Sequence, residues 1–305
     1  MSEGATINPA APSAAQLSTL RAGDKTTSVS LLLLVARTTT ASTAACALGL
    51  TTGESGGKVT WRAPADFLLI GEDSQSWNEL LVVDFPSRAA LETQLASRVW
   101  HTAAETLQSH GACVLALVGR PMAGLANWCL RRAHHLKPLL RYRRQQRPVQ
   151  TMELSPVTPT EQQIHLLETA PWQRERVAML NLLKFRKRAH YSAGHSTGRS
   201  ASSGPTSGRR AYQRYARVAL RLVLARGGRV AWLGRFEQVL IGGDGTPSTH
   251  LWDEIALIEY PSLEHFRYML NLVEYQDSHA HRDAGLERTQ LLTTRPHKSG
   301  ASASR

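Results

Sequence analysis

Four polar side chains in the second half of the chain are candidates for chemistry: Asn181, Tyr215, His279 and Arg282. Asn181 stands alone inside an apolar run, and a buried amide is costly unless it is hydrogen-bonded. It therefore either bonds to the backbone or a neighbouring strand, or orients a ligand carbonyl or a water. Arg282 could hold a carboxylate through two parallel hydrogen bonds. The alternative for Arg282 is a salt bridge with one of three acidic residues, Asp253, Glu254 and Glu259.

Aromatic residues and a second histidine accompany these candidates. Tyr212 lies three residues before Tyr215 on a predicted helix face, so the pair serves either as core residues or as catalytic groups. His279 and His281 are two residues apart, so on a helix they point to different sides and do not share a metal ion. Either imidazole could act as a general base. Three further aromatic residues are predicted either to wall a ligand pocket or to fill the core: Trp232, Trp252 and Tyr275.

The sequence carries no signature of a bound metal or cofactor. No third metal ligand stands at a useful spacing, and we find no nucleotide loop, nucleophile elbow or pair of carboxylates at glycosidase-like placement. Cys46, Cys113 and Cys129 form no CxxC pair, which favours a reducing compartment. No apolar run is long enough to span a bilayer. We therefore expect a cytoplasmic protein without a cofactor.

The elements that must position these residues occur twice in the chain. The segment GGKVTW at 56–61 resembles GGRVAW at 227–232. In the same order, WNELLVVDFPS at 77–87 aligns with WDEIALIEYPS at 252–262. Each copy then continues into an amphipathic helix and a final apolar strand. Matches that recur in order indicate an internal repeat, which we call repeat one and repeat two.

Hydrophobic periodicity predicts the order β-α-β-β-α-β for repeat two, which is a ferredoxin-like α+β domain. Such a sheet carries helices on one face only, so its other face must be covered. A second copy is the simplest cover, and the two repeats would then form the two-sheet barrel that a homodimer forms from single copies. The pattern leaves open whether the repeats pair within one chain or between chains. The predicted elements are strand 177–186, helix 210–225, strands 229–234, 237–241 and 252–260, a helix after Pro261-Ser262, and strand 287–292.

Repeat two with its lead-in resembles the 1330 family of domains of unknown function. The resemblance rests on LSPVTPTEQ at 154–162, MLNLLKFR at 179–186, AYQRY at 211–215, EYPS at 259–262 and the segment 275–286, and it covers nearly half of the chain. It implies the dimeric α/β barrel superfamily, which includes cofactor-free monooxygenases, isomerases and haem-degrading enzymes beside members without known activity. It implies no particular reaction.

Repeat one keeps the apolar scaffold and lacks the polar groups. Its first helix is predicted to be short or missing, because few residues separate its first strand from Gly56. We therefore expect repeat one to be a structural partner. The predicted counterparts of Asn181, Tyr275 and Arg282 are Leu32, Trp100 and Leu107.

The net charge of +12 is concentrated outside the predicted strands. The stretch 131–147 holds seven basic residues and no acidic one. A solvated linker is the main interpretation, and docking to nucleic acid or another anionic partner is the alternative. The predicted domains are a disordered segment 1–27, degenerate repeat one at 28–120, a basic helical and proline-containing linker at 121–175, repeat two at 176–296 with a flexible insert at 190–208, and a disordered tail 297–305.

Two functions remain in view. The first is a cofactor-independent enzyme, of monooxygenase or isomerase type, that holds a hydrophobic or carbonyl-bearing ligand near Asn181, Tyr215, Trp232 and Arg282. The second is a non-catalytic ligand-binding or assembly protein that docks through the basic linker. Haem binding is a third possibility, and it would need an axial ligand facing the barrel.

Overall fold

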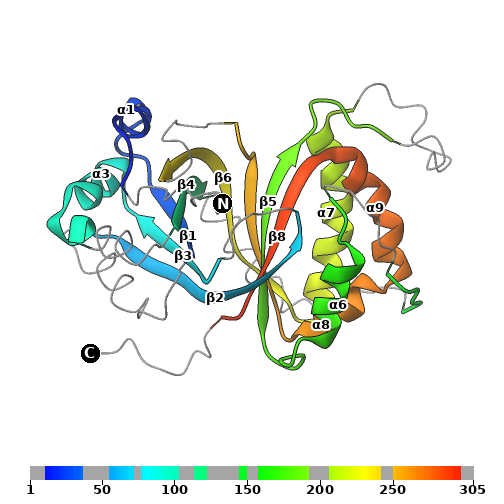
Figure 1. The fold of residues 1–305 in the computed structure, drawn as a ribbon. Coiled ribbons are helices and arrows are strands. Elements are labelled where there is room, and N and C mark those ends of the chain that lie inside the picture. The colour runs from blue at the N-terminus through cyan, green and yellow to red at the C-terminus, as the bar shows by residue number, and fades with distance from the viewer. Residues whose placement is uncertain are drawn as a thin grey trace, which may run out of the picture.

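The computed structural model describes residues 11–36, 55–71, 77–102, 113–121, 144–149, 157–191, 206–241 and 250–296. The strands are β1 (Val29–Ala36), β2 (Lys58–Ile70), β3 (Glu79–Phe85), β4 (Cys113–Pro121), β5 (Val177–Phe185), β6 (Arg229–Ile241), β7 (Glu254–Tyr260) and β8 (Leu286–Thr294). They form a closed antiparallel barrel in the order β1-β3-β2-β8-β5-β7-β6-β4 (Figure 1).

The two halves of the barrel have the same pairing pattern. In repeat one, β1 pairs with β3 and β4, and β2 pairs with β3. In repeat two, β5 pairs with β7 and β8, and β6 pairs with β7. The seams β2–β8 and β4–β6 join the halves and close the ring. The repeats therefore pair within one chain, and the α+β fold of two ferredoxin-like units is confirmed.

Irregularities of the backbone also recur in both repeats. The register of the central strand pair shifts just before Trp61 in repeat one and just before Trp232 in repeat two. Gly56 and Gly227, which precede these strands, both have positive φ angles of 71° and 85°. Glycine adopts this conformation without the strain that a Cβ atom would cause. The sequence alignment between the repeats thus corresponds to matching backbone geometry.

Helices cover the outer face of each half. In repeat two these are α7 (Gly208–Ala225), α8 (Leu263–Leu270) and α9 (Val273–Gly285). The helix predicted after Pro261-Ser262 is thus two helices, of which α8 begins at the Ser262 cap. Conversely, the two strands predicted at 229–234 and 237–241 are one continuous strand, β6. In repeat one, α3 (Arg88–Ala96) begins at the equivalent Ser87 cap, and it lies on the opposite side of the barrel from α7 and α9 (Figure 1). No helix among the described residues is long and apolar enough to cross a membrane.

A helix in front of each repeat corrects the prediction that residues 1–27 are disordered. Helix α1 (Ala14–Ala22) lies in that segment, and α6 (Glu161–Thr169) precedes repeat two. Both begin with a capping box, formed by Ser13 with Gln16 and by Thr160 with Gln163. Helix α1 contacts β6 of repeat two, and α6 contacts β2 of repeat one. Helix α1 forms because the Ser13 cap satisfies its first backbone amides and Leu20 is buried in the core.

Side chains alternate between the barrel interior and the helix-covered face. On β1 and β5, Leu32, Leu34, Leu180 and Leu182 point inward and pack together inside the barrel. The intervening residues pack outward in two separate clusters, one under the helices of each repeat. The molecule thus has one interior core and two outer cores, and a candidate site can differ between the two outer faces.

The structural register corrects the predicted counterpart of Asn181. Val29 and Val177 each pair with the aromatic residue that precedes the Pro-Ser pair of their own repeat. Counting from these two residues places Leu33, not Leu32, at the position of Asn181. A shift of one residue along a strand moves a side chain to the other face of the sheet. Both Leu33 and Asn181 lie on the outer face, so the loss of polarity in repeat one still holds.

Several predictions fall on residues that lie outside the described ranges. They are the predicted counterpart Leu107, most of the basic linker at 122–143 and 150–156, the insert at 192–205, the segment 37–54 between β1 and β2, and the tail 297–305.

Candidate functional site

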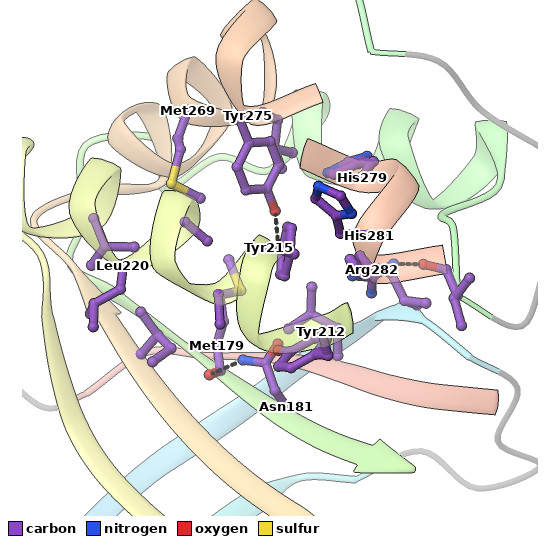
Figure 2. Close-up of a pocket in the computed structure, with 18 of the residues that line it drawn as sticks. Met179, Asn181, Tyr212, Tyr215, Leu220, Met269, Tyr275, His279, His281 and Arg282 are labelled. Carbon is purple, nitrogen blue, oxygen red and sulfur yellow. Dashed lines mark hydrogen bonds between the residues drawn. The ribbon is translucent and has the colours of Figure 1, made fainter. Parts of the chain in front are cut away.

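A cavity of about 1050 Å³ lies in repeat two, between the outer face of the sheet and helices α7, α8 and α9 (Figure 2). Met179 and Asn181 on β5 form part of its floor, and Tyr215 on α7 and Tyr275 on α9 form part of its wall. Repeat one closes one side of it, because Leu69 and Ile70 at the end of β2 also line the cavity. The site therefore belongs to repeat two but needs a strand of its partner.

Asn181 uses its amide nitrogen for structure. The Nδ2 atom donates to the carbonyl oxygens of Met179 at 3.0 Å and Ala256 at 3.4 Å. This is the backbone bonding that was one of the two interpretations of the residue. Its Oδ1 atom has no hydrogen bond to any residue that the structure describes, and the side chain lines the cavity. The oxygen is therefore available to accept a hydrogen bond from a ligand or a water.

Two tyrosines meet above this floor. The hydroxyl groups of Tyr215 and Tyr275 are 2.7 Å apart and hydrogen-bonded (Figure 2). Burial raises the pKa of both phenols, so both carry their protons at neutral pH. One hydrogen bond between two phenols uses one of their two protons. The other proton is a donor for a group in the cavity.

His279 presents a neutral imidazole to the same cavity. Its ring lies edge-on to the Tyr275 ring, with the ring centroids 4.7 Å apart. Burial, reinforced by the charge of Arg282, lowers the pKa of His279 to about 3. Its Nε2 atom is buried and has no hydrogen-bond partner among the described residues. His279 is therefore a weak base in this environment, because an efficient general base has a pKa near the working pH.

Arg282 is a buried cation at the wall of the cavity. Its side chain is 9% exposed, and one guanidinium nitrogen donates to the carbonyl oxygen of Val157. The guanidinium carbon lies 5.9 Å from the centroid of the Tyr215 ring. Its carboxylate neighbour is Asp283, at 3.9 Å, and that side chain is 46% exposed.

The predicted salt bridge of Arg282 with an acidic residue of the sheet is wrong. Asp253, Glu254 and Glu259 each form ion pairs with basic residues other than Arg282, because those residues lie closer to them. The pairs are Asp253 with Lys184, Glu254 with Arg209, and Glu259 with Arg176 and Arg229.

His281 lies at the edge of the cavity and faces another residue. Its Nδ1 atom is 2.9 Å from the hydroxyl of Tyr191, at the start of the insert, and both residues line the cavity. Burial, followed by the charge of Arg214, lowers the pKa of His281. The two histidines therefore do different things, as their spacing predicts: His279 packs against Tyr275, and His281 bonds to Tyr191.

Trp232 and Trp252 are not part of the cavity wall, which corrects their prediction as ligand-binding residues. Both pack inside the barrel with the leucines of β5 and β1. Trp232 belongs to the inward-facing set of β6, so the sheet separates it from the helices. The guanidinium carbon of Arg288 lies 4.9 Å from the Trp252 ring. The structure brings together the other predicted residues, which all line the cavity: Asn181, Tyr215, Tyr275, His279 and Arg282.

Residues that the sequence did not single out also line the cavity. Arg147 and Val157 belong to the predicted linker, and Leu69 and Ile70 belong to repeat one. Each is remote in sequence from the strand and helices of the site. The available signals were the family resemblance, whose segments contain Val157 and Gln276, and the basic stretch that contains Arg147. The described residues contain no group of three or more His, Cys, Asp or Glu side chains placed to hold a metal ion.

Comparisons with known proteins leave the reaction open. No protein-family model matches the chain, so the resemblance to the 1330 family stays a prediction. No curated protein matches it either.

Solved structures do match. The protein RPA0582 of Rhodopseudomonas palustris, a protein of unknown function, is 31% identical over 47% of this chain and 97% of its own, with a TM-score of 0.39. A candidate monooxygenase from Fusobacterium nucleatum is 7% identical over 89% of this chain and 93% of its own, with a TM-score of 0.44. A chlorite dismutase variant from Candidatus Nitrospira defluvii is 12% identical over 92% of this chain and 96% of its own, with a TM-score of 0.41. None of these similarities transfers a reaction to this chain.

Proposed function

We propose that repeat two binds a small and largely apolar molecule that carries one carboxylate or carbonyl group, and that the cavity is an enzyme site for proton transfer beside that group. The buried guanidinium of Arg282 is the observation that carries the proposal. It lines a cavity whose remaining walls are mostly apolar or neutral.

A buried cation is expensive unless an anion and hydrogen bonds compensate it. Arg282 obtains one carbonyl contact, a hydrogen bond with the Tyr215 hydroxyl and a half-exposed carboxylate neighbour. An anionic or strongly polarised oxygen in the cavity would add a full opposite charge, and the guanidinium can bind a carboxylate through two parallel hydrogen bonds. The free phenol proton of the Tyr215–Tyr275 pair supplies a further donor for the same oxygen.

The chemistry that fits is enolisation of a carbonyl compound. His279 Nε2 would accept a proton from the carbon beside the carbonyl. The electron pair of that C–H bond would form a C=C bond, and the π pair of the carbonyl would move onto its oxygen. Arg282 and the phenol donor would stabilise the resulting oxyanion. In an unsaturated carbonyl compound, return of the proton to the far carbon of the conjugated enolate would complete an isomerisation. Burial is the larger cause of the lowered pKa of His279, and the charge of Arg282 adds to it. A bound anion beside Arg282 offsets only that second contribution and makes the imidazole a stronger base to that extent.

A thermal-shift screen of aromatic and aliphatic carboxylates and keto acids tests the binding part. For each compound that binds, Arg282→Gln should weaken binding by about 2 kcal/mol, roughly 30-fold in Kd, because a buried charged contact is lost. Tyr215→Phe should weaken binding less than Arg282→Gln does. It keeps the proposed site testable if Arg282→Gln does not fold. Arg288→Gln is the matched control, because Arg288 also donates to a backbone carbonyl but lies outside the cavity. Equal affinities for the parent, Arg282→Gln and Tyr215→Phe would refute the proposed site.

Catalysis is tested separately from binding. Bound keto acids are incubated in D₂O, and exchange of the protons beside the carbonyl is followed by NMR. We expect exchange with the parent protein and its loss in His279→Gln. Binding without any proton exchange would contradict the proposed catalysis and support a non-catalytic ligand-binding function.

A further inference from the structure

A short segment of the predicted linker runs across the outside of the cavity. Residues 145–148, which we call the strap, pass over the junction between α8 and α9. The Arg147 amide donates to the Asn271 carbonyl at 2.8 Å, and the Val273 amide donates to the Gln145 carbonyl at 3.0 Å. Gln146 and Leu272 form the β-bridge between these two hydrogen bonds. Arg147 itself lines the cavity.

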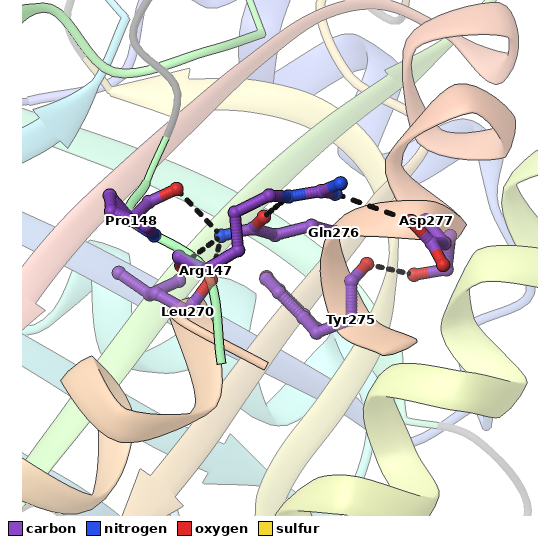
Figure 3. Close-up of polar contacts among 7 residues, drawn as sticks. Arg147, Pro148, Leu270, Tyr275, Gln276 and Asp277 are labelled. Carbon is purple, nitrogen blue, oxygen red and sulfur yellow. Dashed lines mark hydrogen bonds and ion pairs between the residues drawn. The ribbon is translucent and has the colours of Figure 1, made fainter. Parts of the chain in front are cut away.

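One side chain, Gln276 on α9, holds the strap (Figure 3). Its Nε2 atom donates to the carbonyl oxygens of Arg147 at 2.9 Å and Pro148 at 3.1 Å, and also to that of Leu270 at 3.0 Å. Its Oε1 atom accepts from Nε of Arg147 at 2.6 Å. The neighbouring Asp277 adds an ion pair with Arg147 at 3.2 Å.

The strap is held mainly by polar contacts. Residues 145–148 are all exposed, and the adjoining Val149 is half-buried where it lines the cavity. The ion pair joins side chains that are 44% and 65% exposed, and exposed pairs stabilise weakly. Segments with few buried apolar contacts and exposed backbone hydrogen bonds open at a low cost in free energy, without unfolding the rest of the molecule. The wall that the strap provides therefore opens at a low cost.

We propose that the strap is the gate of the cavity and that Gln276 is the positioning residue that keeps it closed. Opening separates Arg147 from Gln276 and Asp277 and admits a ligand beside α9. Closing restores the hydrogen bonds to the strap carbonyls. The inference rests on the proposed function only in taking the cavity as a binding site.

The chain offers a matched control for Gln276. The Nε2 atom of Gln173 also donates to three backbone carbonyls, and its Oε1 atom accepts from an arginine, Arg267. Gln173 is not among the residues that line the cavity. Gln276→Ala and Gln173→Ala therefore remove the same kinds of contact, one beside the cavity and one away from it.

The probe is 8-anilinonaphthalene-1-sulfonate, an apolar aromatic compound with one anionic group. Stopped-flow fluorescence gives its association rate constant with the full chain. We expect Gln276→Ala to raise that constant about tenfold, because the lost hydrogen bonds shift the opening equilibrium by that factor. Gln173→Ala should leave it unchanged. An association rate constant for Gln276→Ala that equals or falls below the parental value would overturn the gate.

Amide hydrogen exchange gives a readout that does not depend on any ligand. The amides of Arg147 and Val273 should exchange about tenfold faster in Gln276→Ala, while those of β5 keep their parental rates. Unchanged exchange at these two amides overturns the gate even if Arg282→Gln weakens probe binding. Conversely, if Arg282→Gln leaves the affinity for the probe unchanged, the proposed function is contradicted. Faster exchange of the Arg147 and Val273 amides in Gln276→Ala would still support the gate.

Discussion

Strands β1 and β5 occupy equivalent positions in the two repeats, yet they resemble each other on one face only. Toward the barrel interior both present leucines, Leu32 and Leu34 in one strand and Leu180 and Leu182 in the other. Toward the helices, Leu33 of β1 is 1% exposed in a packed apolar cluster, whereas Asn181 lines a cavity. The shared interior constrains both strands, because each packs against the other. The outer faces of β1 and β5 pack in two separate clusters, so they are free to differ.

The helices repeat the same contrast. Trp100 of repeat one is 3% exposed and belongs to the outer apolar core. At the equivalent place in repeat two, Tyr275 carries a hydroxyl that reaches Tyr215. A polar group is tolerated in repeat two because a partner or a cavity receives it. The same group in repeat one would have no such partner among the packed residues.

Exchanging the two outer residues between the repeats should give the largest effect. Leu33→Asn should lower the free energy of unfolding by about 4 kcal/mol, because it removes a buried apolar side chain and buries an amide. Asn181→Leu should change it by less than about 1 kcal/mol, since the new side chain extends into the cavity. Urea denaturation measures both values.

Asn181→Leu should in addition abolish ligand binding, whereas the stability loss of Leu33→Asn comes from repeat one. If both substitutions cost the same, the outer faces are equally packed and the contrast between the repeats is wrong.

A fall in pH should lower the free energy of unfolding through His279 of repeat two. The pKa of His279 in the folded protein is about 3, below the 6.5 of the free side chain, so only the unfolded chain takes up this proton as the pH falls below about 6.5. Stability should thus decrease by up to about 2 kcal/mol between pH 7 and pH 5, and continue to fall toward pH 3. His279→Gln should flatten this dependence in denaturation series at each pH.

The control for this series lies in repeat one. His101 follows Trp100 and is exposed, so His101→Gln removes a histidine without touching the cavity. An unchanged slope in His279→Gln would mean that His279 is protonated as readily in the folded as in the unfolded state.

The smallest expected loss of stability comes from removing helix caps, and it should be equal in the two repeats. Ser13→Ala and Thr160→Ala each remove the side-chain cap of a lead-in helix, and each should cost about 1 kcal/mol. The double variant should lose the sum, because the sites are far apart in the fold. A large cost for Thr160→Ala and none for Ser13→Ala would show that α1 adds nothing to stability, and would limit the equivalence of the repeats to the barrel.

Much of the fold could be predicted from the sequence because short local motifs mark the repeat. The GG-V-W segments specify a turn and a strand, and the Pro-Ser pairs cap α3 and α8. Helix α1 escaped notice because few apolar residues mark it and its stability comes from a cap and from packing on β6. The register of β1 was misplaced by one residue because a run of four leucines carries no alternation.

The candidate site was predicted in part for the same kind of reason. Asn181, Tyr275 and Arg282 stand out as polar groups in apolar or helical patterns, and all three line the cavity. Trp232 was misassigned because an aromatic residue in a strand does not reveal which face it occupies. Arg147 and Leu69 could not be found, since tertiary packing alone brings them to the cavity.

Closure of the barrel within one chain also changes how the protein can vary. In a symmetric pair of identical chains, every substitution appears at two places, so a polar residue that opens one pocket also weakens the opposite wall. Here a substitution in β5 leaves β1 untouched, although the two strands share a core. One half can accumulate costly polar groups while the other half stays apolar and supplies the stability.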